Sequence, residues 1–306
     1  MGRALLCGPF LPTAVLAAGA LLEAEDEAAR QKWLPAIVAG DLIATLALPR
    51  VAEPAGPPGT GSLGSPGPVP HAVAAGGPDA GSDWIINGAA ALVVDGHIAD
   101  LVLVPAGTDA GLSLFAVSGG ATGLTPTLQP TFDATRKHAR MQFTATPAVL
   151  IGPAGGAGPV LARVLDLAAV ALAAEQVGVA ERALAMATDH ALLRTQFGRP
   201  IGSFQAVKHK LANVLLEVEA ARSAAWYGLW AADSGRDELP VVASIAKATC
   251  SEAAYLAAAE NMQVHGGMGY TWEHPAHLYF RRATMSRIWL GDPAYHRDLL
   301  LSRLRY

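Results

Sequence analysis

The chain has 306 residues, of which 52% are hydrophobic and 16% are charged, so it can bury a large core in about one to three domains. The net charge of −4 and the lack of any Lys/Arg block argue against nucleic-acid and anionic-membrane surfaces. Cys7 and Cys250 lie far apart and outside any Cys-x-x-Cys pattern. This argues against a disulfide framework or a zinc site and favours the reducing cytoplasm.

The first element along the chain is apolar and helical. Residues 4–22 carry no charge, a pattern also compatible with a signal peptide or a membrane span. Gly8-Pro9 and Pro12 should break a helix there, and the stretch continues into charged helical sequence without a small-residue linker. We therefore interpret it as an interior segment and predict no membrane span. Thr13 is the expected cap of one helix, and Pro35 the expected end of the next.

The middle of the chain has the composition of turns and strands. Residues 51–82 are so rich in Gly and Pro that they predict loops, hairpin turns or a mobile segment. Short runs rich in β-branched residues follow between residues 84 and 153, and Asn87-Gly88 is a strong turn signal. The runs are WIINGAAALVV, DLVLVPA, LSLFAVS and RMQFTAT. They predict a small antiparallel β-domain.

The last part of the chain is predicted to be helical. The pattern indicates four helices, at about 160–193, 203–233, 238–264 and 275–303. Ser203 is the expected cap of the second, Pro240 lies in the first turn of the third, and apolar residues from Phe204 to Val218 predict the buried face of the second. Long helices with short connections pack as an antiparallel bundle.

The predicted fold class is therefore α+β, mostly α, in three parts. An N-terminal helical region covers residues 1–45, and a middle β-domain with the Gly/Pro-rich loop covers 46–155. The C-terminal helical bundle covers 156–306.

An Arg, a Phe and a Gln gather where two of these helices meet, in LLRTQFGRPIGSFQAVKHK. Taken singly, Arg194 suits the C-terminal dipole of a helix and Phe197 suits a core. Taken together with Gln205, they offer a planar fork for phosphate oxygens, an aromatic face and an amide. This combination suits a nucleotide diphosphate.

A second motif, QVHGGMGYTWEHP, lies about sixty residues further on. Gly266 and Gly267 end a helix and would let a ligand approach the backbone closely. The motif is not a Rossmann fingerprint, because its glycines end a helix where that fingerprint opens one. His274 and His277 have no third ligand at a matching spacing, so no metal site is predicted.

These two motifs together resemble those of the acyl-CoA dehydrogenase family. W-x-x-N-G (Trp84, Asn87 and Gly88), followed by Ile98-Ala99-Asp100, extends the likeness into the β-zone. The resemblance implies N-terminal helices, a middle β-domain and a C-terminal four-helix bundle. It also implies FAD, an acyl-CoA thioester substrate, an electron-transfer acceptor and assembly as a dimer of dimers.

The resemblance also assigns roles to the two motifs. In such enzymes the residues that match Arg194, Phe197, Gln205, Gln263 and Gly266-Gly267 hold the pyrophosphate and adenine end of a flavin. That flavin is bound mainly by the neighbouring subunit, so the motifs would lie at a subunit interface.

The chain departs from the family at the catalytic base. The reaction of the family is α,β-dehydrogenation, in which a Glu removes the α-proton and the flavin takes a hydride. The matching text RRATMSRIWLGDPAYH places Leu290 at the base position, and Ala168 falls at the alternative family position. Asp292 is the remaining candidate base, against a role in capping or in the turn before Pro293. Glu175 is interpreted as an interior or interface hydrogen-bonding partner.

The flavin-ring contacts depart from the family as well. Leu92, Val93 and Val94 stand where members usually carry Trp-Ile-Thr, and each lost donor removes about 1 kcal/mol or more. Only Glu53-Pro54 remains of a Thr-Glu-Pro-x-x-Gly-Ser-Asp segment. Met1 matches a position that follows the first helices in other family members, so these helices are expected to be missing.

The half of the site that a subunit lends to its neighbour is thus intact, and the half for its own flavin is eroded. WLGDPAYHRDLL resembles the shorter subunits of actinobacterial heteromeric acyl-CoA dehydrogenases used on steroid side chains and other bulky CoA esters. We therefore predict the base-lacking subunit of a heteromer. The alternatives are a catalytically silent scaffold subunit and a homo-oligomeric dehydrogenase with a displaced base.

Overall fold

The computed structural model describes residues 1–48, 69–74 and 83–304. Glu53-Pro54 and most of the predicted Gly/Pro-rich loop lie outside these residues. The chain divides into two compact units. We call Gly8–Thr131 with Arg136–Ala168 the β-unit, and Met1–Cys7, Phe132–Thr135 and Ala169–Tyr306 the helical unit. The three-part division expected from the sequence stays a prediction.

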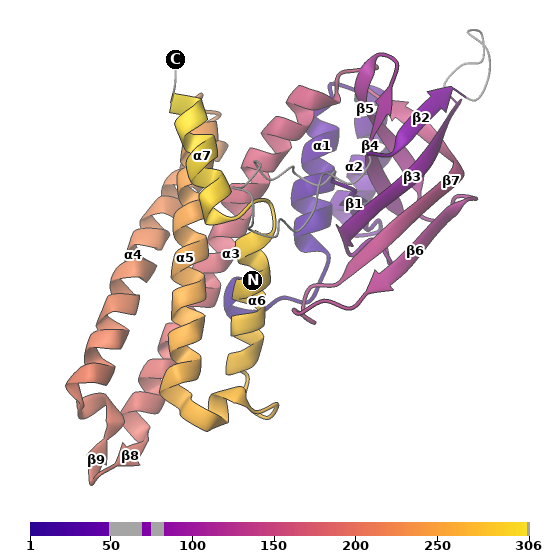
Figure 1. Ribbon diagram of the computed structural model, residues 1–306. Coiled ribbons are helices and arrows are strands. Elements are labelled where there is room, and N and C mark those ends of the chain that lie inside the picture. Colours follow the sequence, from indigo (N-terminus) through magenta and orange to yellow (C-terminus); the bar gives the residue numbers. More distant parts are fainter. Residues whose placement is uncertain (49–68, 75–82, 305–306) are drawn as a thin grey trace, which may run out of the picture. The chain divides into compact units, whose positions relative to one another are not determined.

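The strands of the β-unit form one sheet that closes on itself (Figure 1). Hydrogen-bonded pairs run β4-β2-β3-β7-β5 and return from β5 to β4, while β1 pairs with β4 and β6 with β7. The ladders are antiparallel as predicted, except that β1 and β2 run parallel to β4. The strands are β1 Ala44–Leu46, β2 His71–Ala74, β3 Asp83–Val94, β4 Leu101–Thr108, β5 Gly111–Ser118, β6 Leu124–Gln129 and β7 His138–Ile151.

Asn87-Gly88 is the interior of a strand, so the turn predicted there is wrong. The pair lies within β3, where the register with β7 shifts between Ile86 and Gly88. Gly88 has φ 129°, and a Cβ there would lie 3.0 Å from the Cα of Pro70. The Asn87 side chain accepts a hydrogen bond of 2.8 Å from the backbone N–H of Ala145. The glycine thus serves a β-bulge, which needs the same backbone freedom as a hairpin turn.

The core of the β-unit consists of side chains from the closed sheet. Phe115, Phe143 and Met141 are at most 1% exposed, and the ring of Trp84 lies 5.3 Å from that of Phe115. Burying a large apolar side chain contributes roughly 1.5–3 kcal/mol, so these rings dominate the stability of the sheet.

The N-terminal segment is helical from Leu11 onward, so the interruption predicted at Pro12 is wrong. The π-helical η2 Leu11–Ala17 continues into α1 Ala18–Glu23. Pro12 lies in the first turn, where its missing N–H has no intrahelical partner to lose. Thr13 does not cap a helix. Its hydroxyl donates to the carbonyl of Ala44 (2.8 Å) and accepts from the N–H of the same residue (3.2 Å), which joins η2 to β1.

Helix α2 Glu27–Ala39 continues past Pro35, so the predicted stop is wrong as well. Asp26 caps the helix by accepting from the N–H of Ala29 at 2.9 Å. Its other carboxylate oxygen accepts from Gly152 at 3.0 Å, and these backbone donors lower the pKa of Asp26. The helix ends at Gly40, which adopts the left-handed conformation typical of a helix C-terminus.

The helical unit is built on long helices (Figure 1). They are α3 Ala157–Leu193, which begins in the β-unit, α4 Gln205–Asp233, α5 Leu239–His265, α6 Ala276–Ile288 and α7 Pro293–Leu304. Pro240 lies in the first turn of α5, as predicted. Ser203 is not a cap: the N-cap position of α4 is Phe204, and the buried Ser203 hydroxyl has no hydrogen-bond partner among the residues described. By length and composition alone α3 could cross a membrane, but core helices meet the same criterion, and half of its most apolar window is buried.

The predicted fourth helix of the bundle is in fact two helices. Leu290 and Gly291 have φ values of 63° and 98°, which a right-handed helix cannot accommodate. The chain therefore breaks at residues 289–292, between α6 and α7. A left-handed leucine leaves no mark in the hydrophobic pattern, and for this reason the break could not be read from the sequence.

A buried arginine holds the interior of the helical unit together. Arg282 is 1% exposed and donates to the carboxylates of Asp133 (2.8 Å) and Glu175 (2.9 Å). It also donates to the carbonyls of Leu6 (3.1 Å) and Thr135 (3.0 Å). The interior role predicted for Glu175 agrees with this ion pair. One guanidinium thus joins α6 to α3 and to two segments distant in sequence.

Candidate functional site

The helix break that carries Arg194 is a tight hairpin at one end of the helical unit (Figure 1). Strand β8 Thr195–Gln196 pairs with β9 Arg199–Pro200, and the short 3₁₀ helix η3 Ile201–Ser203 leads into α4. Phe197 and Gly198 form the tip, with φ values of 53° and 76°. Two consecutive positive φ values are those of a two-residue hairpin turn, so the chain reverses within two residues.

The three residues predicted at this break are all exposed. Arg194 follows α3 directly, and its guanidinium makes no hydrogen bond or ion pair with any residue that the structure describes. The Phe197 side chain is 93% exposed. Gln205 is the exposed first residue of α4. Within the part of the chain described, an unpaired cation and a bare aromatic ring thus share one surface.

The second predicted motif lies at the end of α5. Gly266 has φ 61° and starts the 3₁₀ helix η4 Gly266–Tyr270. A Cβ on Gly266 or Gly267 would meet no atom within 4 Å, so the backbone of both residues is open to a ligand. Gln263, one turn earlier, is exposed and donates to the hydroxyl of Tyr270 at 3.3 Å.

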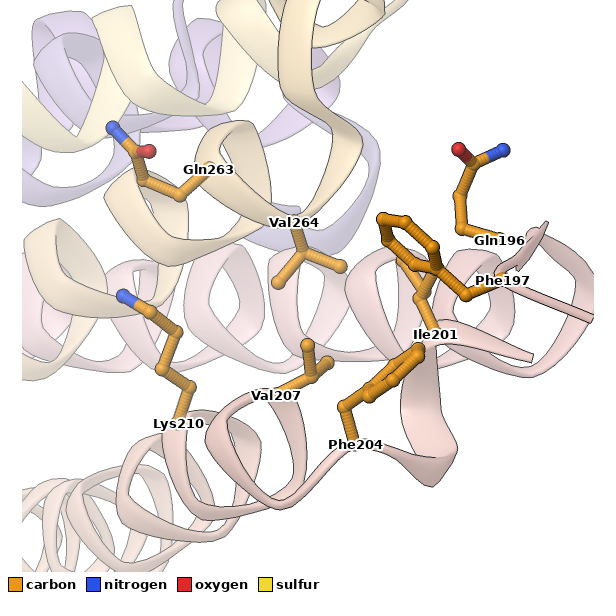
Figure 2. Close-up of a pocket in the computed structure, with 8 residues that line it drawn as sticks. All are labelled: Gln196, Phe197, Ile201, Phe204, Val207, Lys210, Gln263 and Val264. Carbon is orange, nitrogen blue, oxygen red and sulfur yellow. The ribbon is translucent and has the colours of Figure 1, made fainter. Parts of the chain in front are cut away.

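A cavity of about 350 Å³ lies between the hairpin, α4 and α5 (Figure 2). Phe197 and Phe204 lie at one end and Lys210 and Gln263 at the other. The two phenylalanine rings meet edge to face, with centroids 6.2 Å apart. The lining residues are Gln196, Phe197, Ile201, Phe204, Val207, Lys210, Gln263 and Val264. Such a mostly apolar slot with polar groups at one end suits a flat, partly polar ring.

Sequence reasoning found part of this cavity. Phe197 and Gln263 line it, while Arg194, Gln205 and the glycines belong to the segments around it. The pattern assigned Phe204 and the residues after it to the buried face of α4, yet Phe204 and Val207 line the cavity instead. Lys210, which forms an ion pair with Glu260 of α5, carried no signal at all.

Three histidines stack beside this surface. The ring of His265 lies 4.2 Å from that of His190 and 4.3 Å from that of His274. Burial, and then the charges of His265 and Arg194, lower the pKa of His190. His274 accepts from the N–H of Ala276 at 3.2 Å, and no group of three metal-ligating side chains occurs among the residues described.

The two positions matched by sequence to the family base carry aliphatic side chains. Leu290 is half-buried in the break between α6 and α7, and Ala168 is 2% exposed within α3. Asp292 caps α7, since its carboxylate accepts from the N–H of Tyr295 at 2.8 Å. This is the capping role weighed against catalysis in the sequence. Whether Asp292 also acts as a base stays a prediction.

The positions expected to face a flavin ring lack side-chain donors. Leu92 has φ 56° and is 46% exposed, while Val93 and Val94 are buried at the second irregularity of β3. The carbonyl of Val94 accepts from the hydroxyl of Thr45 at 2.7 Å. None of the three side chains can donate a hydrogen bond to a polar ring edge.

Comparison with known proteins decides the family. The model of the acyl-CoA dehydrogenase C-terminal domain matches residues 156–305. Acyl-CoA dehydrogenase FadE27 of Mycobacterium tuberculosis is 34% identical over 298 residues, which cover 95% of this chain and 74% of the relative. The chain belongs to the acyl-CoA dehydrogenase family. Acyl-CoA dehydrogenase IpdE2 of the same organism is 41% identical over 204 residues, 66% of this chain but only 56% of the relative's length.

Solved structures agree with this membership. A variant of the Tcur3481–Tcur3483 steroid ACAD superposes with a TM-score of 0.83 at 32% identity, over 98% of this chain and 77% of the other. The ChsE4–ChsE5 complex from Mycobacterium tuberculosis gives 0.84 at 29% identity, over 99% and 77%. Butyryl-CoA dehydrogenase from Megasphaera elsdenii gives 0.85 at 26% identity, over 97% and 76%.

These matches confirm the predicted fold class. Acyl-CoA dehydrogenases have N-terminal helices, a β-barrel middle domain and a C-terminal helical domain, and members of the family normally bind FAD. Two of the similar structures are heteromeric assemblies.

Proposed function

We propose that this chain is the base-lacking subunit of a heteromeric, FAD-dependent acyl-CoA dehydrogenase. It would act on an acyl-CoA thioester together with a related chain that supplies the catalytic base and the ring contacts. One observation carries the proposal. The residues suited to a dinucleotide lie exposed at one end of the helical unit, with Arg194 unpaired within the described part of the chain, whereas both positions matched to the family base are aliphatic.

The exposed end has the chemistry of a site that a second chain completes. A phenylalanine that is 93% exposed forgoes the roughly 1.5–3 kcal/mol that burial would contribute, and with Leu193 (83%) and Leu192 (66%) it makes this end of the unit apolar. Arg194 offers a fork for two phosphate oxygens, and no acceptor in the described part of the chain occupies it. A partner seated on this surface would cover both residues.

The donor set fits the nucleotide end of FAD. Arg194 and the open backbone of Gly266 and Gly267 would contact the phosphates. Phe197 and Gln263, which line the cavity of about 350 Å³, would contact the adenine end. The bound flavin supplies hydride acceptance, and the residues of this chain hold and orient it.

The partner chain would have to supply the catalytic base. Leu290 and Ala168 cannot take a proton, and the carboxylate of Asp292 is engaged in capping α7. A Glu of the partner would therefore remove the α-proton. A bulky acyl group such as a steroid side chain fits the similarity to the Tcur3481–Tcur3483 steroid ACAD, and a separate acceptor would reoxidise the flavin. Cys7 and Cys250 are free thiols, which suits the reducing cytoplasm.

The test is co-expression with a dehydrogenase-like chain that carries the Glu. We expect a yellow, active complex, and we expect Arg194→Ala to weaken FAD binding about 10- to 100-fold through the loss of charge-assisted hydrogen bonds. Complex formation and thermal stability should stay unchanged, because the guanidinium is unpaired within the described chain. Lys208→Ala removes one exposed charge from the first turn of α4 and serves as the matched control.

Two results would contradict the proposal. A complex that keeps its full flavin content and rate after Arg194→Ala would indicate a silent scaffold subunit. A chain that is yellow and active when purified alone would indicate a homo-oligomeric enzyme, and Asp292→Asn would then test its remaining candidate base.

A further inference from the structure

A lysine is fully buried in the middle of α5. Lys247 is 0% exposed, and its ammonium group makes three hydrogen bonds. It donates to the hydroxyl of Ser251 at 2.9 Å, to the carbonyl of Arg287 at 3.2 Å and to the carbonyl of Gly291 at 2.9 Å. Burying an amine is costly unless all its hydrogens find acceptors, and here each hydrogen has one.

One of these acceptors, Gly291, belongs to the break between α6 and α7, and another, Arg287, lies in the last turn of α6 just before it. The break spans residues 289–292 and contains two left-handed residues, Leu290 and Gly291. Left-handed backbone costs a leucine about 1–2 kcal/mol, so other contacts must hold it. A Cβ on Gly291 would lie 2.3 Å from the ring of Tyr295, so no other residue fits there without rearrangement.

The break is held from a second side by α7. His296 is 4% exposed, and its Nε2 lies 2.9 Å from the carbonyl of Leu290, to which it donates. Asp292 accepts from the N–H of Tyr295 and so fixes the start of α7. Lys247 donates to the carbonyls of Arg287 and Gly291, on either side of Leu290, and so joins this segment to α5.

We propose that Lys247 is a positioning residue that holds the loop at residues 289–292 closed against α5, and that opening of this loop takes up one proton. The inference rests on the proposed function, since position 290 is the family base position and the loop shape decides what that side chain faces. The buried amine would act through the backbone of the loop and would not itself contact substrate.

The coupling to a proton follows from burial. Burial lowers the pKa of Lys247 to about 7, against 10.5 for the solvated group. Between these values the closed form is neutral and an opened, solvated form is protonated. A rise in pH therefore favours the closed loop. The ratio of closed to open loop should increase up to tenfold for each pH unit above about 7 and should not depend on pH below about 7.

The neighbouring groups do not produce the same profile. Burial raises the pKa of Cys250 to about 12 and lowers that of His296 to about 4, so neither titrates between pH 7 and 9. The other charged groups that face this pair are Asp292, Arg287 and Arg303. A neutral Lys247 still has two N–H donors for the carbonyls of Arg287 and Gly291, so the loop stays closed above pH 7.

The experiment is hydrogen exchange of the full chain, followed by mass spectrometry on the peptide that covers residues 285–296. After correction for intrinsic exchange, protection should be constant from pH 6 to 7 and should rise up to tenfold per unit from pH 7.5 to 9. Lys247→Met should lower the protection and abolish its pH dependence. Lys208→Met, at an exposed site on α4, should keep the wild-type profile.

A flat profile in the wild-type chain, or the same profile in Lys247→Met, would overturn the proposal. The wild-type profile decides the question even if Lys247→Met fails to fold. The measurement needs neither flavin nor substrate. A negative hydrogen-exchange result would therefore not contradict the proposed function. Conversely, a chain that does not bind flavin could still show the pH-dependent loop.

Discussion

Arg194 and Arg282 belong to the same unit and stand in opposite surroundings. Arg282 is 1% exposed, with two carboxylates and two carbonyls around its guanidinium. Arg194 is exposed, and no partner occurs for it in the described part of the chain. One arginine is satisfied by its own fold, and the other has its donors free for a molecule that the fold does not contain.

The same contrast holds for the aromatic residues. Phe143 is 1% exposed within the sheet, whereas Phe197 is 93% exposed on a hairpin tip. Residue type alone does not separate a structural role from a binding role. The contacts that a side chain already makes within its own chain do separate them. The contrast predicts that changes in the interior act on stability and that changes at the tip act on binding.

The largest expected effect is the loss of the interior arginine. Arg282→Met leaves two buried carboxylates without their cation and should cost about 3–5 kcal/mol of unfolding free energy. Arg281→Met, one position away, removes a half-buried guanidinium that donates to the carbonyl of Phe132 and lies over the rings of Phe132 and Trp272, and it should cost less, about 1 kcal/mol. Urea unfolding followed by circular dichroism measures both. Similar losses of unfolding free energy in the two variants would show that the buried ion pairs of Arg282 are not what stabilises the interior.

A medium effect is expected from a buried imidazole. Burial, and then the charge of Lys247, lower the pKa of His296 to about 4 from an ordinary 6.5. Between these values the unfolded chain binds the proton and the folded chain does not. Stability from this residue is thus full above pH 6.5 and is lost as pH falls toward 4, by about 3 kcal/mol at the limit.

Urea unfolding at pH 7.5, 6 and 5 checks this prediction. His296→Gln keeps a donor for the carbonyl of Leu290 but cannot titrate, so the decline between pH 6.5 and 4 should shrink. His209→Gln changes an exposed histidine of α4 and should leave the acid profile as it is. If His296→Gln loses stability in acid as steeply as the wild type, burial of this imidazole is not the cause.

The smallest effect on stability is expected at the hairpin tip, where a substitution should act mainly on binding. Phe197 has φ 53°, a conformation that glycine adopts without strain. Phe197→Gly relieves this strain but loses the edge-to-face contact with Phe204, so the stability of the isolated chain should change by less than about 1 kcal/mol. Flavin binding in the complex should weaken about tenfold. Thermal unfolding and flavin titration measure the two effects, and a stability loss above about 1 kcal/mol would show that the ring serves the fold more than the ligand.

The long helices could be predicted from the sequence because their periodicity extends over many turns. The predicted spans 160–193, 203–233 and 238–264 differ from α3, α4 and α5 by at most three residues at either end. Elements set by a single residue could not be predicted. Asn87-Gly88 carries the same signal for a bulge as for a turn, and Pro35 is accepted inside α2. Strand β2 is set in a Gly/Pro-rich zone, and β6 contains Pro126.

The site divides in the same way. The sequence showed that Arg194, Phe197 and Gln263 suit a nucleotide, because their chemistry is legible without coordinates. It could not show that Phe204 and Val207 line a cavity, since helical spacing is the same for a core and for an open slot. Nor could it show that Lys247 and Arg282 are buried, because a sequence gives the charge of a residue but not its surroundings.

The position of Arg282 in the chain has a consequence for biosynthesis. Its partners include Leu6 and Asp133, which leave the ribosome long before residue 282 does. Until residue 282 is made, the segments around Leu6 and Asp133 lack the cation that fixes them. The interior of the helical unit would therefore be completed late in synthesis, and a chain that stops before residue 282 should expose two carboxylates that Arg282 otherwise hides.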